Sequence, residues 1–97
     1  MSFPFVMNAQ TGTISGKVVD ANTGQALIGS SIQVVGTNTG AITDENGEFL
    51  IANQKTPINL EITYVGYDKK TLTITNYNPV KISLNEIFNQ FDELVVV

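Results

Sequence analysis

Short segments in which apolar and polar residues alternate fill most of this chain between Thr13 and Leu84. A period of two places successive side chains on opposite faces of a β-strand. The segments are also rich in Thr, Val and Ile, which favour strands. No stretch of this region has a convincing helical period. The pattern predicts an all-β chain whose strands each have one buried face and one solvent-exposed face. It is clearest at 14–19, 32–35, 60–64, 71–75 and 80–84.

Turn-forming residues separate these segments at short intervals, at 20–24, 36–40, 44–47, 53–57 and 64–67. Asn46-Gly47 directly precedes the apolar segment 48–51 and predicts a β-hairpin, because both residues tolerate positive φ. Six or seven short strands at this spacing indicate an antiparallel β-sandwich. The residues to which we assign structural roles in turns are Gly24, Gly29, Gly40, Asp44, Asn46, Gly47 and Gly66.

The two ends of the chain differ from its middle. Residues 1–12 form an uncharged, largely apolar leader, which is either the remnant of an export signal or a disordered extension. Residues 13–84 form the expected sandwich, and 85–97 form a linker that ends in two acids and four aliphatic residues. An unpaired strand this apolar is prone to aggregation unless it pairs with the edge of a sheet. It is therefore either the last strand of the sandwich or a strand meant for another protein.

Composition excludes several functions. The 97 residues include five lysines, no arginine and nine acids, for a net charge of −4, which argues against nucleic-acid binding. The chain has no His and no Cys, which removes imidazole and thiolate metal sites, catalysis by these side chains, and disulfides. No apolar run approaches the roughly 20 residues of a membrane helix, so we expect no membrane insertion by this segment.

Residues that could support catalysis or ion binding are better explained structurally. The acids of Asp44-Glu45-Asn46-Gly47-Glu48 lack the spacing of an EF-hand loop, and we interpret this segment as a capped turn. Asp20, Glu61 and Asp68 are scattered over predicted turns and strand faces. Thr37, Thr39 and Thr43 flank Gly40 without a phosphate-loop lysine. We therefore predict a non-enzyme with no catalytic, cofactor or metal residues.

Three tyrosines are the best candidates for a ligand-binding surface. Tyr64, Tyr67 and Tyr77 could stack on the apolar faces of a sugar. Tyrosines in a small sandwich more often cover its ends and keep their hydroxyl groups in water. We favour that structural interpretation, and the sugar site remains the alternative.

Three sequence motifs occur in an order and at a spacing typical of one family. They are the segments 16–29, which begins Gly16-Lys17-Val18-Val19-Asp20, 32–49, and Tyr64-Val65-Gly66-Tyr67. Together they resemble the carboxypeptidase-regulatory-like domain, a seven-stranded sandwich of transthyretin-like, Ig-like topology. The resemblance covers about Thr11 to Leu84. Ile28 stands where the family usually has Pro, which loosens one turn and leaves the predicted fold intact.

The last seven residues resemble a segment of a narrower group. Phe91-Asp92-Glu93-Leu94-Val95-Val96-Val97 is similar to the segment that joins this domain to the plug of SusC-like, TonB-dependent outer-membrane transporters of Bacteroidetes. The resemblance implies a periplasmic accessory domain followed by a plug and barrel. It also implies that Asp92, Glu93, Leu94, Val95, Val96 and Val97 bind the TonB C-terminal domain by β-augmentation. A SusD-like lipoprotein would be reached through the barrel, and the usual cargo would be a glycan.

Two other functions fit the same fold. The domain could be a cell-surface adhesion or carbohydrate-binding module, for which the three tyrosines would form the platform. It could also be the regulatory appendage of a metallocarboxypeptidase, although such a protein gives no reason for the acidic and aliphatic tail. The positions of the tyrosine rings discriminate the first of these from the transporter interpretation.

Overall fold

The computed structural model describes residues 11–87, which form seven β-strands and no helix. Within this part of the chain nothing helical is long and apolar enough to cross a membrane. The prediction of a seven-stranded all-β chain is therefore confirmed. The strands are β1 (Gly12–Asp20), β2 (Ser31–Val34), β3 (Gly40–Ile42), β4 (Glu48–Gln54), β5 (Ile58–Thr63), β6 (Lys70–Ile74) and β7 (Val80–Leu84).

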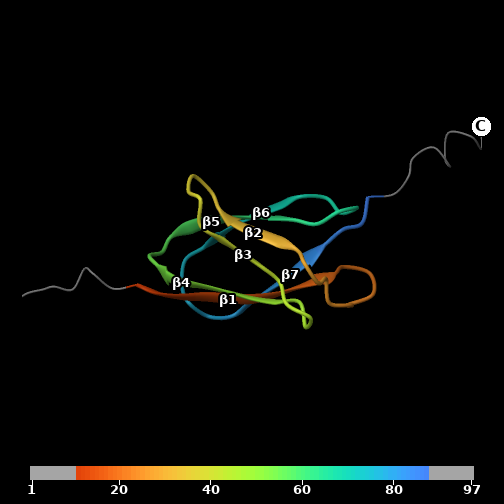
Figure 1. Cartoon of the computed structure of the whole chain (residues 1–97), viewed down its shortest axis with the longest axis horizontal. Helices are drawn as coiled ribbons and strands as arrows, with labels where there is room; N and C mark the ends of the chain where they lie inside the picture. The colour runs from red at the N-terminus through yellow and green to blue at the C-terminus, as the bar shows by residue number, and fades with distance from the viewer. Residues whose placement is uncertain (1–10, 88–97) are drawn as a thin grey trace, which may run out of the picture.

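The strands form two sheets that pack face to face (Figure 1). One sheet has the order β4-β1-β7 and the other has the order β3-β2-β5-β6. Four of the strand pairs are antiparallel, but β7 runs parallel to β1, with Gly16 opposite Val80 and Asp20 opposite Leu84. The sandwich is thus mostly antiparallel, as expected, with one mixed sheet that the sequence did not indicate. Residue alternation reports which face of a strand is buried, and it carries no information about strand direction.

The core lies between the sheets and consists of the inward-facing residues of the alternating segments. Ile14, Val18 and Ile82 from one sheet face Ile32, Leu60 and Ile62 from the other, and all are at most 1% exposed. Val19 departs from the expected alternation, because it is buried although its neighbour Val18 points into the core. The segment after β1 folds back over it, and Ala26 pairs with Val19 in an isolated bridge.

The turn at Asp44–Gly47 does not close the predicted hairpin. It joins β3 to β4, which belong to different sheets. Gly47 has φ of 77°, as expected, whereas Asn46 is not among the residues with positive φ. Asn-Gly therefore indicates the local backbone shape correctly, but a local turn signal does not determine which sheet the next strand joins.

The folded region extends slightly beyond both predicted boundaries. At the start, Gly12 already pairs with Gln54 of β4. At the end, the Asp68 amide donates to the Asn85 carbonyl and the Ile87 amide donates to the Gly66 carbonyl, each at 2.8 Å. Residues 85–87, which the sequence assigned to the linker, are thus bonded to the connection between β5 and β6.

Candidate partner-binding groove

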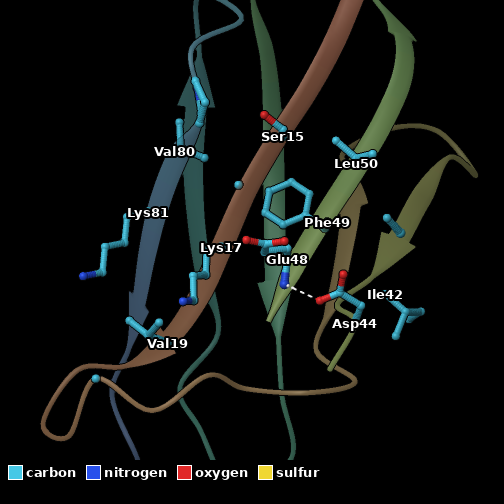
Figure 2. Close-up of a pocket in the computed structure, with 14 residues that line it drawn as sticks. Ser15, Lys17, Val19, Ile42, Asp44, Glu48, Phe49, Leu50, Val80 and Lys81 are labelled. Atoms are coloured by element: carbon cyan, nitrogen blue, oxygen red, sulfur yellow. Dashed lines mark hydrogen bonds between the residues drawn. The ribbon is translucent and has the colours of Figure 1, made fainter. Parts of the chain in front are cut away.

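The outer face of the three-stranded sheet carries an open groove of about 770 Å³ (Figure 2). Residues of β1 and β7, among them the outward-facing Lys17 and Lys81, line its floor, and the β3–β4 turn forms one wall. Figure 2 shows Lys17 and Lys81 on the side of β1 and β7, and Leu50, Ile42 and Asp44 on the other side. The groove therefore has a basic half and a half that is apolar and acidic.

Strand register creates the basic half. Lys17 of β1 lies opposite Lys81 of β7 and, on its other side, opposite Glu48 of β4. Side chains at directly opposed positions share one face of a sheet, with Cβ atoms roughly 5 Å apart. No carboxylate among residues 11–87 comes within 4 Å of either lysine ammonium group, and the ion pair described for this region joins Lys69 and Glu61 elsewhere. Two like charges are thus held side by side.

The apolar part of the groove comes from two strands at the adjoining edges of the two sheets. Leu50 of β4 is 69% exposed and Ile42 of β3 is 61% exposed. Both lie on the groove surface. Large aliphatic side chains this exposed are a feature of interaction surfaces when they are clustered.

The β3–β4 turn that forms the wall is held by the Asp44 carboxylate. One of its oxygens accepts the amide N–H groups of Asn46, at 2.8 Å, and Glu48, at 2.9 Å. The backbone hydrogen bonds from Glu48 and Asn46 lower the pKa of Asp44, because they stabilise its charged form. The carboxylate therefore stabilises the turn through these two hydrogen bonds. Within residues 11–87 no three His, Cys, Asp or Glu side chains gather as a metal site requires.

The predicted turn glycines fall into two groups. Gly24, Gly29, Gly47 and Gly66 have positive φ, as does Gly36, which lies in the predicted turn 36–40 but was not among the glycines assigned a structural role. Gly40 does not share this conformation. It is instead the first residue of β3, where a Cβ would collide with the Ile32 carbonyl oxygen. Glycine at position 40 therefore allows β3 to approach β2 closely.

The three tyrosines do not assemble into one platform. The Tyr64 and Tyr67 rings pack together, with centroids 5.4 Å apart, and both contact the hydrophobic core. Tyr77 lies at the opposite end of β1, against Gly12, and its hydroxyl donates to the Gln54 carbonyl. The structural interpretation of these residues is supported, and the sugar-binding alternative loses the surface on which it depended.

Tyr67 also joins the connection between β5 and β6 to the end of β1. Its hydroxyl donates to Oδ2 of the buried Asp20 at 2.6 Å, while Oδ1 accepts the amides of Asn22 and Thr23. The bond from Tyr67, with those from the two amides, lowers the pKa of Asp20. The same bond raises the pKa of Tyr67 to about 12, because it favours the protonated phenol.

The predicted partner-binding residues Asp92–Val97 lie outside the described part of the chain. The groove, by contrast, was not predicted from the sequence. Alternation already placed Lys17 and Lys81 on outward faces, but their adjacency depends on the parallel β1–β7 pair. Only a correct strand order would have revealed it.

Comparison with known proteins assigns the fold to a family. Residues 14–96 match the family model described as the CarboxypepD_reg-like domain. The chain belongs to this family. Similar proteins include the TonB-dependent receptor SusC of Bacteroides thetaiotaomicron, which is 34% identical over 93 residues, or 92% of this chain. The TonB-dependent receptor P3 of Formosa agariphila is 26% identical over 91 residues, or 94% of this chain.

These relatives are much longer proteins, since the matched region covers 8% of the first and 9% of the second. Among solved structures, a chain in a type II Cohesin-X-Dockerin complex from Acetivibrio cellulolyticus superposes with a TM-score of 0.57 at 23% identity. The match covers 74% of this chain and 51% of that chain. This likeness supports the β-sandwich fold and no more.

Proposed function

We propose that this chain is the non-catalytic, periplasmic accessory domain at the N-terminal side of a TonB-dependent outer-membrane nutrient transporter. The observation that carries the proposal is the likeness to two TonB-dependent receptors over more than nine-tenths of the chain. The absence of His and Cys from the sequence agrees with a role without chemistry. A glycan is the proposed cargo class. A SusD-like lipoprotein would meet the barrel of such a transporter and not this domain.

We further propose that Asp92–Val97 is the strand that the TonB C-terminal domain takes up. The last described residues, 85–87, are bonded to the connection between β5 and β6, and the acidic and aliphatic segment begins five residues after Ile87. A segment with this spacing can leave the sandwich and add to a partner's sheet. Backbone hydrogen bonds would then supply affinity, and alternate aliphatic side chains would fill pockets. Asp92 and Glu93 would speed encounter with a basic partner.

The test is an NMR titration of the isotope-labelled chain with purified TonB C-terminal domain. Binding should shift the amide signals of Asp92–Val97. Val96→Pro should abolish binding, because proline removes one backbone donor and restricts φ. Gln90→Pro, in the same tail but before the acids, is the matched control and should bind normally. An unchanged spectrum at high TonB concentration, or equal binding by both variants, would contradict the proposal.

A further inference from the structure

We propose that the groove on the outer face of the β4-β1-β7 sheet is a docking site for the chain's own segment Asp92–Val97. The docked segment would be a resting state, released when a partner strand competes for it. This inference goes beyond the proposed function and does not depend on TonB, because it concerns the isolated chain.

The first argument is charge. Lys17 and Lys81 are directly opposed on neighbouring strands, an arrangement that costs free energy through like-charge repulsion. Glu48 lies opposite Lys17 but forms no ion pair with it within 4 Å. One oxygen of the Asp44 carboxylate on the groove wall, Oδ1, already accepts two backbone amides. A ligand with one or two carboxylates would relieve the repulsion between the lysines, and Asp92-Glu93 supplies two.

The second argument is the order of chemical groups across the groove. Lys17 and Lys81 line one side of the groove, and the exposed aliphatic side chains of Leu50 and Ile42 line the other (Figure 2). The segment Asp92-Glu93-Leu94-Val95-Val96-Val97 has acids first and aliphatics directly after them. In an extended conformation Glu93, Val95 and Val97 share one face. With Glu93 on the lysines, Val95 and Val97 would cover Leu50 and Ile42.

The third argument is reach. Lys81 precedes Ile87 by six residues, so the two lie at most about 20 Å apart at the rise of a β-strand. Glu93 follows Ile87 by six residues, and six extended residues also reach about 20 Å. A chain that turns back after Ile87 can therefore bring Glu93 to Lys81. The four aliphatic residues extend this reach further, by about 13 Å, towards Leu50.

A spin-label experiment on the full chain tests the proposal. The sequence contains no cysteine, so Val97→Cys provides one unique site for a nitroxide. The label should broaden the amide signals around Lys17, Lys81 and Leu50, with no dependence on protein concentration. The double variant Lys17→Gln/Lys81→Gln should remove this broadening. Lys55→Gln, which changes a lysine that does not line the groove, is the matched control and should leave it intact.

Three results would overturn the proposal. They are an absence of broadening at the groove, broadening that survives the double lysine substitution, and broadening that grows with protein concentration. The last result would assign the contact to a second molecule. A parallel measurement uses Asp92→Asn/Glu93→Gln, which should shift the Lys17 and Lys81 amide signals without any label. Added salt should weaken the contact, because it screens exposed charges. If the spin-label experiment contradicts docking in the groove, the result expected from the TonB titration does not change. The two proposals are therefore separately testable.

Discussion

Replacing Gly47 by alanine tests the packing of the β3–β4 turn against the centre of the three-stranded sheet. Gly47 has φ of 77°, and a Cβ there would lie 2.8 Å from the Val18 carbonyl oxygen and 3.0 Å from the Ala26 Cβ. Gly24 has nearly the same φ, 78°, but a Cβ at that position would have no heavy atom within 4 Å. The pair of substitutions therefore separates backbone strain from steric conflict.

The expected magnitudes follow from these two terms. A left-handed conformation costs a residue with a Cβ about 1–2 kcal/mol. Alanine also makes the unfolded chain less flexible than glycine does, which stabilises the folded state by about 0.4–1 kcal/mol. Gly24→Ala should thus lower the free energy of unfolding by about 0–1.6 kcal/mol. Gly47→Ala carries the same cost, and overpacking against the Val18 backbone adds about 1–3 kcal/mol.

Urea and thermal unfolding of the two variants provide the assay. In a domain of 60–100 residues, 1 kcal/mol shifts the Tm by about 4–8 °C. Gly47→Ala should therefore melt at least about 4 °C below Gly24→Ala. Equal melting temperatures for the two variants would refute the close approach of the turn to β1.

Two further substitutions address buried hydrogen bonds. Tyr67→Phe should weaken the loss of stability below about pH 4, because Asp20 loses the hydrogen bond from Tyr67 that lowers its pKa. The same substitution should remove the loss of stability between pH 10 and about 12, which follows from the raised pKa of Tyr67. Unfolding measured across both pH ranges checks this prediction, and unchanged curves would contradict it. Thr43→Val should cost about 1–3 kcal/mol, because the Thr43 hydroxyl donates to the Leu27 carbonyl and accepts the Ser30 amide. Thr43→Ser, which keeps the hydroxyl, should unfold close to wild type.

Sequence reasoning succeeded where local chemistry decides the structure. Alternation identified the buried faces of the strands, as at Ile14 and Ile82, because side-chain direction follows from the backbone geometry of a single strand. Asp44 and Gly47 were recognised as turn residues for a similar reason. An Asx side chain and a glycine determine the shape of a few neighbouring residues.

Sequence reasoning failed where the structure depends on residues far apart in the chain. The parallel pairing of β1 with β7 and the separation of β3 from β4 are decided by how whole sheets pack, not by any short motif. The groove was missed for this reason, since Lys17 and Lys81 become neighbours only through that pairing. Val19 shows a different limit, because the segment directly after β1 folds back over a residue that alternation placed on the surface.

The position of β1 between β4 and β7 also has a consequence for the order in which the chain can fold. The first strand needs the last one, which follows about sixty residues later, and closing a loop of that length is an entropic barrier. Until Val80–Leu84 is available, one side of β1 is an open edge that can pair with other chains. A chain cut short before residue 80 should therefore aggregate and not persist as a smaller, stable domain.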